Sequence, residues 1–237
     1  MGHYTNLFRN ALHAHVLYDP KIEQFFMENY ITRLTYQPKE LFSNKFQGGA
    51  QAISYFQKGM FKLYGLSSDG QEIFSGFIPR YSTLITLQNG SKIGKYLCAN
   101  DDAIVYIAAR DDYLNFITTN KELTWKQLNE PYYRRNANAL PLYETMNLSS
   151  REKVYIYILY LGIRFGDTGK NSRLVMVHPP TLKDVANYNG VHPNSVSRYY
   201  NELRNQDLIE FSHKKLVIFD ADALDKVIVS LKYTDNN

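Results

Sequence analysis

The stretch 181–219 constrains the fold more than any other part of the chain. Thr181 and Asp184 have the spacing of a helix N-terminal cap, so a helix is predicted to begin here. Gly190 accepts the positive φ of a tight turn, and Pro193 suits the first position of a second helix, where its missing N–H has no helical partner to lose. Two helices joined by a tight turn are therefore predicted.

The spacing inside this stretch agrees with two crossing helices. Ala186 is small where the second helix would cross, and Val196 would face the shared core. After the second helix, about 193–206, the apolar runs 208–211 and 216–219 predict a β-hairpin wing. The unit is a winged helix-turn-helix, a motif that presents the N-terminal turn of its second helix to the major groove of DNA.

The exposed residue types on the second helix suit base reading. Asn194 and Arg198 lie four residues apart on one face, with Ser197 beside them. Arginine can hold guanine O6 and N7 together, and asparagine can pair with adenine N6 and N7. An alternative interpretation is that Arg198 pairs with Glu202 one turn later and touches no DNA. The wing carries Lys214 and Lys215, which would approach phosphates.

The first half of the chain has the pattern of an antiparallel roll or sandwich. From about residue 34 to 109, short apolar or alternating runs are broken by turn residues every 8 to 12 positions. Asp69-Gly70 fits a hairpin turn. Two short helices are predicted before these runs, over 7–17 and 22–29. The predicted strands are 52–56, 60–66, 72–77, 82–87, 93–98 and 103–108.

A long helix is predicted over 121–147, after a short helical piece at 111–117. Its apolar stripe would form a dimer seam, or else pack on the chain's own roll. Pro131 and Pro141 predict a kink or break, because a proline inside a helix removes a backbone donor. The stripe consists of Leu128, Tyr132, Arg135, Ala139, Leu142 and Met146.

These patterns divide the chain into three parts of an α+β protein. Residues 1–120 hold the β-roll with its short N-terminal helices, 121–148 form the connecting helix, and 149–237 form the winged-helix domain. Ser149 or Ser150 would cap a helix over 151–165, which begins the last part. Residues 174–177 are a predicted strand, ended by two prolines.

Composition excludes several classes of protein. The chain has one cysteine, Cys98, which cannot form an internal disulfide, and it has no run of 18 apolar residues, so we expect a cytoplasmic protein without a membrane span. The net charge of +4 alone does not establish a nucleic-acid partner. No phosphate loop, nucleophile elbow or His-Glu-x-x-His motif occurs, so no enzyme is predicted. Among the histidines only His13 and His15 are near neighbours, so no metal site is predicted either.

The order of parts resembles the Crp/Fnr (catabolite activator / fumarate-nitrate regulator) family of bacterial transcription factors. The most specific stretch is 185–198, which ends in the Val-Ser-Arg typical of the family's recognition helix, and a weaker match is 53–59, a strand leading into a glycine turn. The resemblance covers the chain from about Tyr18 onward. It implies a cyclic-nucleotide-binding-like β-roll, a long dimerising helix and a C-terminal winged helix, in a homodimer that binds a two-fold symmetric operator on double-stranded DNA and that contacts RNA polymerase.

The resemblance also implies roles for individual residues. Arg198 stands where the family's guanine-reading arginine stands, and Ser197 where several members have a serine contact. Asn194 replaces a glutamate that accepts from cytosine, which predicts a different half-site at that base pair. Ser195, Lys214 and Thr181 align with phosphate-contacting positions.

The effector side departs from the family pattern. The segment 84–96 lacks the glycine-glutamate turn and the arginine-serine pair that hold cyclic AMP, so we expect no cyclic-AMP binding, and Lys92 and Lys95 are interpreted as solvated surface. The chain also lacks the clustered cysteines of the iron–sulfur variant. Two possibilities therefore stay open: the protein responds to an unidentified small-molecule effector, or it has no effector. Certain aromatic residues of the roll would line a pocket or simply form its core: Tyr55, Phe61, Tyr64, Phe74 and Phe77.

Two functional hypotheses from different classes follow. The first is a dimeric, sequence-specific transcription regulator. The second is a ligand-binding or protein-interaction module whose winged helix has lost its affinity for DNA. Salt dependence separates them, because neutralising phosphates makes affinity fall steeply as salt rises.

Overall fold

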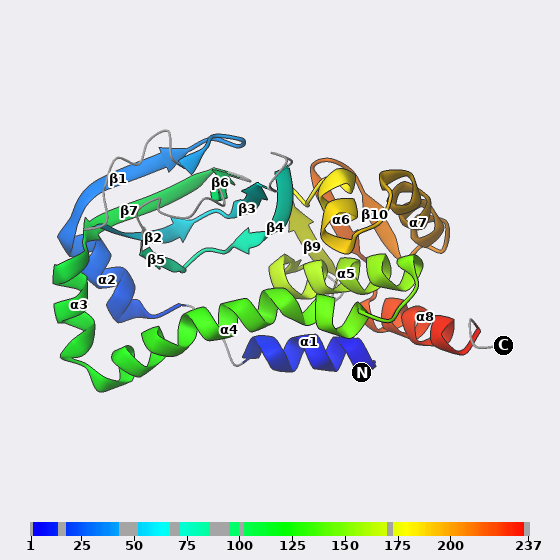
Figure 1. Ribbon diagram of the computed structural model, residues 1–237, viewed down its shortest axis with the longest axis horizontal. Helices are drawn as coiled ribbons and strands as arrows, with labels where there is room; N and C mark the ends of the chain where they lie inside the picture. The colour runs from blue at the N-terminus through cyan, green and yellow to red at the C-terminus, as the bar shows by residue number, and fades with distance from the viewer. Residues whose placement is uncertain are drawn as a thin grey trace. The chain divides into compact units, whose positions relative to one another are not determined.

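The computed structural model describes residues 2–13, 18–42, 52–66, 72–85, 95–99, 102–169 and 173–234. The chain forms two compact units, and each is described by itself. One unit comprises Val16–Arg135, and the other combines Met1–His15 with Asn136–Asn237. Figure 1 shows the elements in chain order. The α+β class and the predicted order of parts are confirmed.

The first unit is an antiparallel β-roll. One sheet has the strand order β1-β7-β2-β5 and the other the order β4-β3-β6. The bounds are β1 Tyr30–Tyr36, β2 Ala52–Lys58, β3 Phe61–Leu66, β4 Glu72–Ile78, β5 Thr83–Ile85, β6 Lys95–Ala99 and β7 Ala103–Ala109. β3 and β4 pair from Phe61 and Ile78 to Leu66 and Glu72. The turn predicted at Asp69-Gly70 lies outside the described residues.

Strand β2 separates two apolar clusters by the alternation of its side chains. Phe56 packs with Phe61 and Val105 inside the roll. Ile53 and Tyr55 lie in a second cluster that contains residues of α2 (Pro20–Asn29) and α3 (Arg110–Thr118). The roll is therefore filled on its inner side and covered by helices on the other.

The roll's aromatic residues are packed together. Phe61, Phe74, Phe77 and Tyr55 are each at most 1% exposed, whereas Tyr64 is partly buried. The ring of Phe61 lies 5.2 Å from that of Phe56, and the rings of Phe74 and Phe77 are also 5.2 Å apart. Of the two interpretations left open by the sequence, these contacts favour a core.

The long helix α4 runs from Lys121 to Thr145. The helix continues through Pro131 and Pro141, so a break at either proline is wrong, whereas a kink there stays a prediction. A proline removes its own N–H and crowds the carbonyl four residues earlier, which can bend a helix without ending it. The exposed apolar side chains Leu128 and Met146, both in the predicted stripe, are 70% and 72% exposed.

Helix α5 (Ser150–Phe165) is the centre of the second unit. Ser149 and Glu152 form a reciprocal capping box at its start, and its middle is buried from Val154 to Gly162. A Cβ on Gly162 would meet Cδ1 of Ile218, so the glycine lets α5 lie close to that side chain. The remaining elements are α6 (Leu182–Asn189), α7 (Pro193–Asn205), α8 (Ala221–Thr234) and a four-stranded sheet ordered β10-β11-β9-β8. These strands are β8 Asp167–Thr168, β9 Leu174–Val177, β10 Ile209–Phe211 and β11 Lys215–Ile218.

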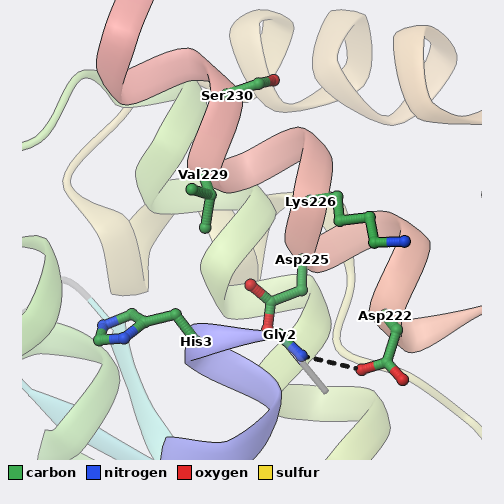
Figure 2. Close-up of a pocket in the computed structure, with 7 residues that line it drawn as sticks. All are labelled: Gly2, His3, Asp222, Asp225, Lys226, Val229 and Ser230. Atoms are coloured by element: carbon green, nitrogen blue, oxygen red, sulfur yellow. Dashed lines mark hydrogen bonds between the residues drawn. The ribbon is translucent and has the colours of Figure 1, made fainter.

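The first helix, α1 (His3–His13), packs in this second unit against α5 and α8. Phe8 is fully buried, and its ring meets that of Tyr160 edge-on at 5.4 Å. The amide of Thr5 donates to the buried carboxylate of Asp225, and the amide of Gly2 donates to Asp222 beside a pocket between the two helices (Figure 2). The predicted division places residues 1–15 with the roll, whereas α1 contacts α5 and α8 of the winged-helix part.

Candidate nucleic-acid interface

Helices α6 and α7 form the predicted helix-turn-helix. Thr181 accepts a hydrogen bond from the amide of Asp184 at 3.1 Å, and the Asp184 carboxylate accepts from the Thr181 amide at 2.9 Å. Gly190 ends α6 in the left-handed region, with φ 64° and ψ 37°. Pro193 is the first residue of α7, and the ring of His192 caps it by accepting from the amide of Asn194. Local sequence therefore sets the start, turn and restart of the motif.

Helix α7 has a buried face and an exposed face. Val196, Tyr199, Tyr200 and Leu203 are buried. The predicted base-reading residues lie on the other side: Asn194 and Arg198 are exposed, and Ser197 is partly buried. Asn194 and Arg198 are one helical turn apart, so their side chains share a face. The fold thus brings the three predicted base readers together on one helix.

Arg198 is exposed but not without contacts. Its side chain is 65% exposed, and its Nε lies 3.8 Å from Oε1 of Glu202. Its guanidinium carbon lies 5.0 Å from the centre of the Tyr199 ring, and one terminal nitrogen donates to the Tyr199 hydroxyl at 3.2 Å. The alternative pairing of Arg198 with Glu202 is therefore present, as a long contact that leaves most of the Arg198 side chain exposed.

Glu202 connects α7 to the first turns of α5. Its Oε2 accepts from the Tyr155 hydroxyl at 2.9 Å and lies 2.9 Å from Nε of Arg151. Burial raises the pKa of Tyr155 to about 12, with the contact to Glu202 also raising it and Arg151 lowering it, so this hydroxyl keeps its proton at neutral pH. Sequence reasoning missed Arg151 and Tyr155, because they lie 47 or more residues from Glu202 and no local pattern links them.

The wing consists of β10, β11 and the turn between them. The hydroxyl of Ser212 accepts from the amides of Lys214 and Lys215, each at 3.2 Å, which fixes the turn. Lys214 is exposed at the tip. Lys215 pairs with Glu210 at 2.9 Å, so part of its charge is already neutralised. Lys214 is therefore the better placed of the two predicted phosphate contacts.

The two other predicted phosphate contacts lie at helix starts. Thr181 is exposed at the N-terminus of α6, and Ser195 is partly buried in the first turn of α7. Backbone N–H groups point outward at helix N-termini and favour anions. Both positions suit a phosphate oxygen.

Buried tyrosine rings join the elements that carry the predicted DNA-contacting residues. The rings of Tyr157 and Tyr188 stack at 4.1 Å, joining α5 to α6, and Tyr200 meets Phe211 of the wing at 4.6 Å. Burial raises the pKa of Tyr157 well above its ordinary value. These aromatic contacts fix α6 to α5 and the wing to α7.

The C-terminal unit matches a known family. Residues 152–227 match the Crp-like helix-turn-helix domain. This chain carries a Crp-like DNA-binding domain. It is accordingly a DNA-binding transcription regulator, and the resemblance to Crp/Fnr regulators is confirmed. No curated protein matches the chain by sequence.

Solved structures show the same fold over most of the chain. A cyclic nucleotide-binding domain containing protein from Listeria monocytogenes EGD-e is 16% identical with a TM-score of 0.66, covering 85% of this chain and 99% of its own. The regulator TTHB099 of the CRP family from Thermus thermophilus is 14% identical with a TM-score of 0.63, covering 83% and 96%. FixK2 from Bradyrhizobium japonicum is 19% identical with a TM-score of 0.60, covering 82% and 96%.

Two further observations concern the part of the chain that the structure describes. None of its helices is both long and apolar enough to cross a lipid bilayer. Within the same residues, no group of three or more histidine, cysteine, aspartate or glutamate side chains is arranged to hold a metal ion.

Proposed function

We propose that this Crp-like regulator acts as a homodimer that reads a two-fold symmetric operator through α7. The observation that carries the proposal is the exposed face of α7, where Asn194, Ser197 and Arg198 stand together on a helix whose other face is buried. In a helix-turn-helix dimer, each recognition helix enters the major groove, and the half-sites lie about 34 Å apart.

Some of these residues would read bases, and others would hold phosphates. Arg198 would hold a guanine, Asn194 an adenine, and Ser197 would add a contact to either. Thr181, Ser195, Lys214 and Lys215 would hold phosphates, which fixes the register but carries no base information.

Two copies of the chain would pair through their α4 helices. The second copy would supply the second recognition helix of the dimer. Leu128 on α4 and Met146 just after its end belong to the predicted seam and are largely exposed in the single chain. Trp125 and Tyr143, also on α4, are 69% and 61% exposed. Exposed apolar side chains of this size gain free energy when a partner covers them. A second copy of α4 is the partner we propose.

The protein would bind DNA in the cytoplasm and regulate transcription through contact with RNA polymerase. The roll would be the part that controls this activity. An unidentified small molecule, or none, would control the protein. Most of the segment 84–96, which departs from the cyclic-AMP pattern, lies outside the described residues, so the expected lack of cyclic-AMP binding stays a prediction. We propose no catalytic step and no cofactor.

Selection of bound sequences from a random DNA pool tests the proposal. A two-fold symmetric motif is the expected result, and a change of motif or affinity on adding a small-molecule fraction of a cell extract would reveal an effector. Recovery of no motif, with affinity insensitive to salt between about 50 and 200 mM, would favour an interaction module instead.

Two variants separate reading from positioning. Arg198→Ala should abolish the preference for the operator while largely sparing binding to random DNA. Lys214→Ala should weaken binding to all sequences almost equally, because it removes a phosphate contact. An equal loss on every sequence for Arg198→Ala would refute its role as a base reader.

A further inference from the structure

The Glu202 carboxylate is held in place by α5 before it meets Arg198. Its Oε2 takes both contacts from α5, from the Tyr155 hydroxyl and from Arg151, each at 2.9 Å. The same Arg151 nitrogen also lies 3.3 Å from the Tyr155 hydroxyl, which closes a three-residue ring of contacts. A carboxylate with one oxygen so engaged has a fixed orientation, and its Oε1 is left to face Arg198.

The contact between Glu202 and Arg198 is too long for a hydrogen bond. It can therefore orient the arginine by charge while the guanidinium stays able to bind a base. The Nε to Oε1 distance of 3.8 Å exceeds hydrogen-bond length, and the guanidinium lies against the Tyr199 ring. Tyr199 is itself 7% exposed and packs edge-on against Tyr155 at 6.3 Å. The stem of Arg198 therefore rests on a support that is fixed to α5, while 65% of the side chain stays open.

The electrostatic arrangement also suits a DNA-facing surface. A carboxylate near phosphates repels them, but Glu202 lies between Arg151 and Arg198, so the cluster of three charged groups carries one net positive charge. The cluster can orient Arg198 without making the surface negative.

We propose that Glu202 is a positioning residue for Arg198. Tyr155 and Arg151 hold Glu202 so that the guanidinium is already directed along the exposed face of α7 when a base pair arrives. This inference rests on the proposed base-reading role of Arg198. Preorganisation of this kind raises discrimination, because fewer rotamers of the long side chain must be lost on binding.

The test compares Glu202→Gln with a matched control, Glu210→Gln. Both variants remove one negative charge from the winged-helix unit, but Glu210 contacts Lys215 on the wing. Binding is measured by competition between the selected operator, operators changed at one base pair, and random DNA, in the full-length protein. The base pair read by Arg198 is the one at which Arg198→Ala loses its preference.

Glu202→Gln should lower the preference at that base pair by about tenfold, and at no other, with unchanged or stronger binding to random DNA. Tyr155→Phe, which keeps the ring and removes the hydroxyl, should give a smaller loss at the same base pair. Glu210→Gln should leave the preference unchanged at every position.

The outcomes distinguish this inference from the proposed function. If Arg198→Ala abolishes the preference and Glu202→Gln keeps it, the positioning role is wrong and the base-reading role stands. An equal loss at all base pairs, or an equal effect of Glu202→Gln and Glu210→Gln, would show a structural or purely electrostatic role and overturn the inference. A wild-type protein without any base preference would refute both.

Discussion

Phe8 offers a direct test of where the first helix belongs. Its side chain is fully buried between α1 and α5 and meets Tyr160 at 5.4 Å. Phe8→Ala removes that ring and leaves a cavity, which for a fully buried phenylalanine costs about 3–5 kcal/mol of unfolding free energy. Since about 1.4 kcal/mol is a factor of ten, the population of the opened C-terminal unit should rise by roughly two to three and a half orders of magnitude.

Amide hydrogen exchange measures this opening region by region. The amides of α5 and α8 should lose protection by that factor in Phe8→Ala, whereas those of β2 and β7 should keep theirs. The matched control is Phe26→Ala, because Phe26 is equally buried but stacks on Tyr55 in the roll unit at 4.9 Å. That variant should lower protection in the roll strands instead.

Two results would contradict this placement of α1: Phe8→Ala leaves the exchange of α5 unchanged, or it exposes the roll strands as strongly as Phe26→Ala does. Either result would mean that α1 does not contribute its packing energy to the winged-helix unit.

Three further predictions concern the stability of that unit. Thr181→Ala removes a reciprocal cap and should lower the unfolding free energy by about 1 kcal/mol, measured by urea titration. Gly190→Ala should cost about 1–2 kcal/mol through the left-handed backbone alone, since no atom lies within 4 Å of the added Cβ, and Gly190→Asn should cost less. Burial raises the pKa of Tyr155 and of Tyr160 to about 12, above the ordinary 10.0. Stability should therefore be level below pH 10 and should fall above it, by about 1.4 kcal/mol per pH unit for each tyrosine, because the unfolded phenols ionise first. Urea titrations on both sides of pH 10 check this, and a level profile up to pH 12 would contradict it.

The helix-turn-helix could be predicted because its signals are local. The cap at Thr181, the turn at Gly190 and the start at Pro193 each act within four residues, and α7 ends one residue before the predicted Gln206. The alternation of the roll strands is equally local, so β2, β3 and β7 were found with ends displaced by one or two residues. The sequence predicts no strand for β1. The roll pattern begins only at about residue 34, whereas pairing with β7 starts at Tyr30.

The rest depends on contacts between distant parts of the chain. Helix α1 carries no signal that it will pack on α8, since Thr5 and Asp225 are separated by 220 residues. The link from Arg151 and Tyr155 to Glu202 likewise exists only once α5 and α7 have packed together. The face and residue types of the recognition helix were predictable, whereas the groups that support Arg198 were not.

The packing of α1 has a consequence for synthesis of the protein. At about 5–20 residues per second, a ribosome that has completed α1 needs about 10 to 40 seconds before it reaches Asp225. The roll is made entirely in that interval and can fold first, while α1 stays uncovered until α5 and then α8 have been made. A nascent chain stalled before residue 150 should therefore hold a folded roll and an uncovered α1, with Tyr4 and Phe8 open to chaperones.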